Sequence, residues 1–304
     1  MLTSSETKKV VLNLFPGAHW VVHETPKFPW HRDRSKAVTA SLAHSSQALA
    51  LDLFATIERS QSRNAIVDYW VESLGLPLKG PWTITPEFQV PASLLGEPRS
   101  TQVDAIATGA GGLVLFECKF TEPGGGSCSQ TRSIAKGRHS GLHQCNGNYE
   151  EQHNPASPGS ASARCVLSAK GVKYWNLIPD VLNIAAQEDH RPCPFAGSWY
   201  QWMRNLVSAL ALARQKDIPT AVVVVYADGS FPMAKHVDEK DWKEFASIVT
   251  GTVPLRTVSY QTLLAWAKAA ALPADLRLVE DLEAWMLNKI SSVERRAAAP
   301  SLDG

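Results

Sequence analysis

The spacing of apolar residues along the chain predicts an alternation of helices and strands. Apolar positions recur every three or four residues in six stretches, which predicts helices at 46–60, 64–75, 198–215, 238–249, 260–269 and 273–296. Runs rich in β-branched and aromatic residues predict strands near 84–90, 101–107, 113–120, 220–226 and 255–259. The run at 220–226 is almost wholly apolar, as expected for a strand buried on both faces of a sheet.

Three segments fall outside this alternation. Residues 1–44 have no steady period and are expected to form an irregular arm that docks through its aromatic residues. Residues 121–197 are rich in glycine and polar residues, so we interpret them as an insertion within a domain spanning 45–304. Residues 228–304 form a C-terminal extension of helices and a strand. Paired strands followed by strand–helix alternation predict an α/β fold with a mixed sheet flanked by helices.

Composition narrows the class of protein. The 304 residues include 30 Lys and Arg against 29 Asp and Glu, which excludes a uniformly basic nucleic-acid coat but not a local basic groove. Five dispersed cysteines do not describe a small disulfide scaffold. The longest apolar run, near 221–227, is far shorter than a membrane span, and no signal peptide of the usual shape is present. We therefore expect a cytoplasmic protein that does not enter membranes.

The two strands at 101–107 and 113–120 predict a hairpin with an acidic pair. If residues 109–112 form a four-residue loop, Asp104 lies opposite Glu117. Opposed residues have Cβ atoms about 5 Å apart. Two carboxylates at that separation repel each other unless a cation or a proton lies between them.

The same face of the hairpin collects further polar groups. Strand periodicity places Lys119 beside Glu117, with Gln102 opposite, while Cys118 faces the core. Oxygen ligands in this arrangement suit Mg²⁺ or Mn²⁺, and a neighbouring lysine can orient a water or stabilise developing charge. The alternative is a structural ion cluster at the end of a sheet.

Asp104, followed after twelve residues by Glu117-Cys118-Lys119, resembles the PD-(D/E)XK signature of restriction-endonuclease-like nucleases. The core of that superfamily runs αβββαβ, with the acidic pair on the second and third strands. The predicted elements follow this order over residues 45–227. Two features depart from the pattern, because Val103 replaces the signature proline and the insertion after the third strand is unusually long.

The resemblance implies roles for particular residues. Asp104 and Glu117 would bind Mg²⁺ with the backbone carbonyl of Cys118, and Lys119 would position the attacking water. Some branches add a glutamine near the metal from the second helix, where Gln201 lies here. Three more residues are candidates for phosphate or metal contacts on the two helices: Gln47, Glu58 and, about one turn after Gln201, Arg204.

Four cysteines lie in the insertion: Cys128, Cys145, Cys165 and Cys193. Four thiolates can hold Zn²⁺ or an iron–sulfur cluster, and a metal would stabilise a segment that has little apolar core of its own. We therefore predict a metal-stapled insertion, with Zn²⁺ preferred. Their spacing contains no Cys-x-x-Cys, so the alternative is that the thiols bind nothing.

The first part of the insertion is basic. Residues 119–173 contain seven Lys and Arg against three Glu, interleaved with aromatic residues. This composition suits a nucleic-acid backbone and a stacked base, and Arg132, Lys136 and Arg138 are the candidate contacts. A solvated loop is the alternative.

Together these patterns predict a Mg²⁺- or Mn²⁺-dependent endonuclease that hydrolyses phosphodiester bonds, with DNA favoured over RNA and a setting in restriction or defence. One rival is a non-catalytic, metal-stapled nucleic-acid-binding protein on the same fold. A second is a zinc enzyme whose catalytic site lies among the cysteines. An oligomer is compatible with the sequence.

Overall fold

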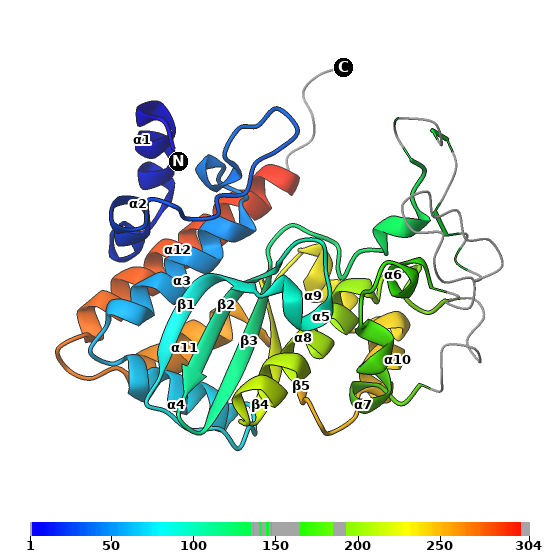
Figure 1. Ribbon diagram of the computed structural model, residues 1–304. Coiled ribbons are helices and arrows are strands. Elements are labelled where there is room, and N and C mark those ends of the chain that lie inside the picture. Colours follow the sequence, from blue (N-terminus) through cyan, green and yellow to red (C-terminus); the bar gives the residue numbers. More distant parts are fainter. Residues whose placement is uncertain are drawn as a thin grey trace.

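The computed structural model describes residues 2–134, 136, 140–141, 144–145, 147, 165–184 and 193–298. Its centre is a five-stranded sheet in the order β1-β2-β3-β4-β5 (Figure 1). β2 is antiparallel to both β1 and β3, while β4 is parallel to both β3 and β5. The strands are β1 (Thr83–Val90), β2 (Thr101–Gly109), β3 (Gly112–Lys119), β4 (Thr220–Tyr226) and β5 (Leu255–Ser259). The predicted mixed sheet is confirmed.

Helices cover both faces of the sheet (Figure 1). One apolar core lies beneath α3 (Ser46–Arg59), α4 (Arg63–Ser73), α11 (Tyr260–Ala270) and α12 (Leu276–Ala298). A second core lies beneath α5 (Ala92–Leu95), α7 (Ile178–Val181), α8 (Tyr200–Lys216), α9 (Pro232–His236) and α10 (Lys240–Ile248). The C-terminal extension therefore belongs to the main fold, because β5 completes the sheet and α11 packs against α4.

The β2–β3 hairpin has the predicted register. Gly109 pairs with Gly112, and Ala105 pairs with Phe116, so continuing the ladder places Asp104 opposite Glu117. Gly109 is required at this turn because a Cβ atom there would lie 2.5 Å from the carbonyl oxygen of Lys79. The local sequence of the hairpin thus fixes which strand residues face each other.

The N-terminal arm differs from its prediction, because it is largely helical. It contains α1 (Ser4–Asn13) and α2 (Trp20–Glu24), and the start of α1 is closed by a capping box between Thr3 and Glu6. An apolar cluster that includes Val10, Val21 and Leu51 packs the arm against α3. The expectation of an irregular arm missed the capping signal.

The insertion is partly described and holds one further short helix, α6 (Val166–Ala169), beside α7. The chain returns from it at Cys193 and begins α8 at Tyr200. Among the described residues, no helix combines the length and apolar character that a membrane crossing requires.

Candidate active site

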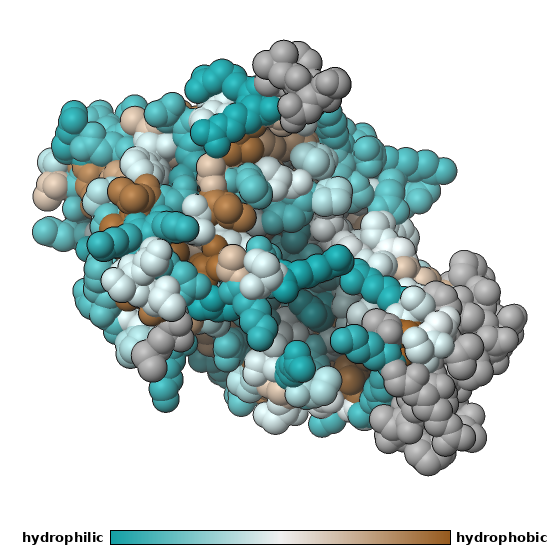
Figure 2. Space-filling model, turned by 90° about the horizontal axis from the view of Figure 1, so that it is seen from above, coloured by the Kyte–Doolittle hydropathy of each residue, from teal (hydrophilic) through white to brown (hydrophobic). Residues whose placement is uncertain are grey.

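A polar pocket of about 380 Å³ opens where β2 begins and β3 ends. Six of its lining residues are ones that the sequence analysis placed on the hairpin face or on the second helix: Gln102, Asp104, Glu117, Lys119, Gln201 and Arg204. This end of the sheet is the upper one in Figure 1, and the view from above is hydrophilic around its recessed centre (Figure 2). The structure therefore brings residues from two distant parts of the sequence into one cavity.

The ionised form of Asp104 is disfavoured in this pocket. Its Oδ2 accepts a hydrogen bond of 2.7 Å from the backbone N–H of Cys118, while Oδ1 has no hydrogen-bond partner among the described residues. Burial, followed by the charges of Glu117 and Glu87, raises the pKa of Asp104 well above its usual value. A cation or a proton at this position would relieve the repulsion.

Glu117 is buried and held from three directions. Its Oε1 accepts hydrogen bonds from Gln201 Nε2 and, at 2.7 Å, from Lys119 Nζ, which is the lysine predicted beside it. Its Oε2 accepts a hydrogen bond of 2.9 Å from Asn205 Nδ2. Lys119 Nζ also donates to Gln201 Oε1 at 2.9 Å, so these side chains form one network.

Lys119 and Asn205 are the donors of this network that hold the two oxygens of Glu117. Burial lowers the pKa of Lys119, but the carboxylates of Glu117 and Asp104 outweigh it and leave that pKa above its usual value. Asn205 was not among the predicted site residues. It lies four residues after Gln201 on α8, so helical spacing from Gln201 is the signal that would have found it.

The position of α8 depends on a close contact with the start of the insertion. Gln201 N–H donates a 2.9 Å hydrogen bond to the carbonyl oxygen of Gly125. A Cβ atom on Gly125 would lie 2.4 Å from both the Ser198 carbonyl oxygen and the indole nitrogen of Trp202. This glycine lets the insertion leave β3 and still seat α8 directly beside Glu117.

A third carboxylate, Glu87, lies behind the pocket and was missed by the sequence analysis. The β1–β2 register pairs Pro86 with Ala105 and Phe88 with Val103, which places Glu87 level with Asp104. Glu87 is 3% exposed and has a backbone φ of +50°, a region that costs a non-glycine residue free energy. Its position opposite Asp104 is visible only once the β1–β2 register is known.

His31, also missed, reaches this carboxylate from the N-terminal arm and lines the pocket. Its Nε2 lies 3.3 Å from Glu87 Oε2. Burial lowers the pKa of His31, but the hydrogen bond to Glu87 and the negative charges of Glu87, Asp104 and Glu117 raise it overall. The arm thus adds a cationic group to a site that the sequence placed on the hairpin alone.

The two predicted phosphate contacts on the helices, Arg204 and Gln47, have different surroundings. Arg204 lines the pocket, with its guanidinium carbon 5.9 Å from the centroid of the Tyr200 ring. Gln47 is 1% exposed, and its side chain binds the His31 N–H at 3.0 Å and the Pro29 carbonyl at 3.2 Å. The prediction that Gln47 contacts nucleic acid is therefore wrong, because its side chain is used up in anchoring the arm.

The remaining candidates lie away from the pocket. Glu58 accepts hydrogen bonds from Arg63 at 3.0 Å and from the Ile84 N–H at 2.6 Å, so it joins α3 to α4 and β1. Arg132 and Lys136 are exposed and do not line the pocket. Arg138 lies outside the described residues.

No disulfide joins the four cysteines of the insertion among the described residues, and backbone hydrogen bonds join the segments of Cys128, Cys145 and Cys193. Cys128 N–H binds the Phe195 carbonyl at 3.2 Å, and Cys193 N–H binds the Gly147 carbonyl at 2.6 Å. Gly147 N–H in turn donates to Cys145 Sγ at 3.4 Å. Burial mainly, with smaller contributions from the other three cysteines, raises the pKa of Cys128 to about 12.

No three His, Cys, Asp or Glu side chains of the described residues form a ready-made metal site. For the cysteines, the predicted metal therefore stays a prediction. For the sheet pocket, Mg²⁺ also stays a prediction; such an ion usually keeps several waters and needs only one or two carboxylates from the protein. Asp104 Oδ1 and the second lone pair of Glu117 Oε2 are the donor positions that fit such an ion.

The mixed five-stranded sheet flanked by helices is an α/β architecture consistent with a restriction-endonuclease-like fold. A family model described as "Restriction Endonuclease associating with ARP" matches residues 19–284, and the chain belongs to that family. The match includes most of the arm and the extension, beyond the 45–227 of the sequence resemblance. Neither the curated proteins nor the solved structures contain a match to the chain.

Proposed function

We propose that this protein is a Mg²⁺- or Mn²⁺-dependent endonuclease of the PD-(D/E)XK type that hydrolyses phosphodiester bonds in DNA. The observation that carries the proposal is the pair formed by the partly buried Asp104 and the buried Glu117, beside Lys119 in an open polar pocket. The raised pKa of Asp104 supports it, because a site that gathers like charges is suited to hold a cation. Family membership supports nuclease activity and a DNA substrate.

Asp104, Glu117 and the backbone carbonyl of Cys118 would hold the metal ion. When bound, the ion supplies a more acidic water and neutralises charge on the phosphate oxygens. Lys119 Nζ, a hydrogen-bond donor already fixed by Glu117 and Gln201, would orient the attacking water and stabilise the charge that develops. Arg204 would bind a non-bridging phosphate oxygen.

The supporting residues keep this arrangement in place. Gln201 and Asn205 hold both oxygens of Glu117, so the carboxylate cannot rotate freely. Such hydrogen bonds around a metal-binding carboxylate change metal affinity or activity about 10–100-fold when they are removed. The role proposed for α8 is therefore to orient Glu117.

The test is cleavage of plasmid and short duplex DNA, and of RNA, in Mg²⁺ or Mn²⁺. We expect wild-type protein to cut DNA and the Asp104→Ala and Lys119→Ala variants not to. Cleavage that survives both substitutions would refute the site. Binding of DNA without cleavage by wild-type protein would instead support the non-catalytic binding module.

We also propose that Cys128, Cys145, Cys165 and Cys193 bind a structural Zn²⁺, with an iron–sulfur cluster as the alternative. The backbone hydrogen bonds that join the segments of Cys128, Cys145 and Cys193, and the N–H donated to Cys145 Sγ, support this. Metal analysis of the purified, untagged protein is expected to give about one zinc per chain. Protein that is folded by circular dichroism but contains neither zinc nor iron would contradict it.

A further inference from the structure

His31 is fixed at the mouth of the pocket by an unusually complete set of contacts. Its N–H donates to Gln47 Oε1 at 3.0 Å, and its carbonyl accepts the Thr39 N–H at 2.9 Å. Its ring lies 3.2 Å from Gln102 Nε2 and 3.3 Å from Glu87 Oε2. Contacts from α3, β1 and β2, together with one within the arm, therefore determine where this imidazole lies.

Glu87 behind it accepts a hydrogen bond from Gln102 Nε2, but only through Oε2. Its side chain is fully buried, and its Oε1 has no hydrogen-bond partner among the described residues. Its backbone also lies in the disfavoured region at φ +50°. A buried carboxylate in a strained position, with one oxygen unpaired, is costly unless it serves the site that it faces.

The contact to Glu87 leaves one nitrogen of His31 for a ligand. Both ring contacts, to Glu87 Oε2 and to Gln102 Nε2, are made by Nε2. The other nitrogen, Nδ1, is therefore the one without a hydrogen-bond partner among the described residues. The side chain is 45% exposed and lines the same pocket as Asp104. A histidine whose second nitrogen is held by a carboxylate is the arrangement used to orient an imidazole for proton transfer.

His31 and Lys119 lie on either side of Asp104 in the strand order. Lys119 is on β3, whereas His31 contacts β1 through Glu87, and β2 with Asp104 runs between them. Both side chains line the pocket. In-line displacement places the attacking water and the leaving oxygen on opposite sides of the phosphorus, so the two residues can serve the two sides.

We propose that His31 is a catalytic residue, the general acid that protonates the sugar oxygen leaving the phosphorus, and that Glu87 is its positioning residue. The inference rests on the proposed function. Water forms the new bond to phosphorus and releases one proton to solvent, and the bond from phosphorus to the sugar oxygen breaks with its electron pair on that oxygen. The proton on His31 Nδ1 passes to this oxygen, and the neutral imidazole is reprotonated from solvent.

The electrostatics agree with this role. Glu87, Asp104 and Glu117 are the charged groups that raise the pKa of His31 against the effect of burial, so the ring is charged at a higher pH than usual. Lys119 is the cation across the pocket. A general acid must carry its proton at the working pH, and a raised pKa extends the pH range in which His31 does so.

The test compares His31→Gln and Glu87→Gln with wild type on two substrates in Mn²⁺. One substrate is ordinary duplex DNA. The other carries a sulfur in place of the leaving bridging oxygen, chosen after the product ends show which oxygen leaves. A thiolate leaves without a proton, so general-acid catalysis is not needed for it. His23→Gln is the matched control, because His23 is exposed on α2 and lies outside the pocket.

We expect His31→Gln to lower kcat about a hundredfold on ordinary DNA, the usual contribution of a general acid, and less than about threefold on the sulfur substrate. Glu87→Gln should follow the same pattern with a smaller loss, and His23→Gln should match wild type on both. Because each variant is compared on two substrates, a partial folding defect cancels from the ratio.

Equal losses on both substrates, or no loss on either, would overturn the role of His31 while leaving the nuclease proposal intact. If wild-type protein cleaves neither substrate, the proposed function itself fails, and the inference fails with it. These outcomes separate the two claims.

Discussion

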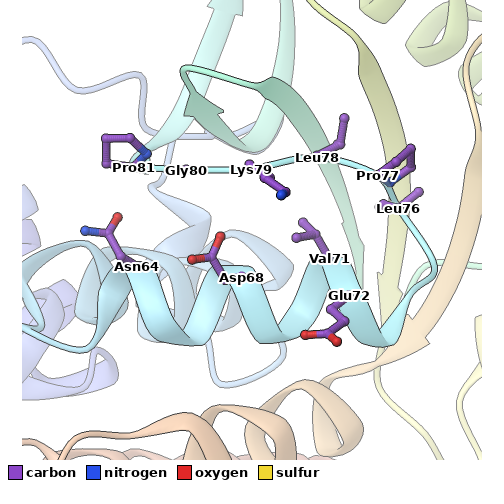
Figure 3. A pocket seen from close by; sticks show the side chains of 10 residues that line it. All are labelled: Asn64, Asp68, Val71, Glu72, Leu76, Pro77, Leu78, Lys79, Gly80 and Pro81. Carbon is purple, nitrogen blue, oxygen red and sulfur yellow. The ribbon is translucent and has the colours of Figure 1, made fainter.

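Two pockets of the molecule show that the volume of a pocket does not indicate its chemistry. The larger, about 770 Å³, lies between α4 and residues 76–81 (Figure 3). Asn64 and Asp68 point from the helix toward that segment, and both are satisfied there, by the backbone and the indole N–H of Trp82 at 2.6 and 2.7 Å. The smaller pocket, about 380 Å³, gathers carboxylates that repel one another.

The difference shows what distinguishes a structural hollow from a reactive one. In the larger pocket Asn64 and Asp68 each accept a hydrogen bond from Trp82, which helps to hold the start of β1 onto α4. In the smaller one, the pKa of Asp104 is raised by desolvation first, and then by Glu117 and Glu87, which lie close to it without enough compensating positive charge. Stored electrostatic repulsion, rather than volume, marks the site where a metal ion and a phosphate would be bound.

The largest expected effect is that of Asp104→Asn in the smaller pocket. The substitution keeps the size of the side chain and removes the charge that would hold the metal, so single-turnover cleavage should fall at least about a thousandfold. Rapid-quench kinetics on a labelled duplex measures it. A loss below about tenfold would show that Asp104 is no metal ligand.

The next largest effect is expected from Asn205→Ala, which frees one oxygen of Glu117. Metal affinity should weaken about 10–100-fold while metal-saturated kcat falls less, because the carboxylate is present but no longer oriented. Cleavage rates measured across a Mg²⁺ titration separate the two parameters. An unchanged metal requirement would argue that Asn205 serves only the packing of α8.

Asp104 and Asn205 also show how much of the site can be predicted from the sequence. The Asp104–Glu117 pair follows from the hairpin alone, because a short loop sets the register locally. Asn205 required knowing which turn of α8 faces β3. Glu87 and His31 depend on the β1–β2 register and on the docking of the arm, contacts between residues far apart in the chain that no local pattern reports.

The same distinction explains the elements that the sequence placed well or badly. The run of valines in β4 predicts a buried strand with the bounds the structure has. The arm was missed because Pro16 and Gly17 break its pattern into short pieces, although Thr3 and Glu6 form a capping box. From the sequence, Gln47 is expected to be an exposed polar residue of a helix, but the arm covers it.

A smaller effect is expected from Arg204→Ala at the rim of the smaller pocket. Loss of one phosphate contact should weaken DNA binding uniformly across sequences and reduce the slope of log affinity against log salt by about 0.9. Fluorescence anisotropy in Ca²⁺, at several salt concentrations, measures this without cleavage. A parallel shift with an unchanged slope would mean that Arg204 does not contact a phosphate.

The smallest effect on cleavage is expected from Asp68→Asn, the counterpart of Asp104→Asn in the larger pocket. Its hydrogen bond to the Trp82 indole loses its charge, so the free energy of unfolding should fall by about 1 kcal/mol while cleavage stays within twofold of wild type. Urea unfolding followed by tryptophan fluorescence provides the first number. A large loss of cleavage in a folded variant would move the reactive site to the larger pocket.

The most direct measurement of the central claim is the single-turnover cleavage of one DNA duplex in Mg²⁺ by wild type, Lys119→Gln and Asp68→Asn, side by side. Each substitution removes one charge from one pocket. We predict that Asp68→Asn cuts at the wild-type rate and that Lys119→Gln is slower by at least about a hundredfold. Wild-type cleavage by Lys119→Gln would contradict the account.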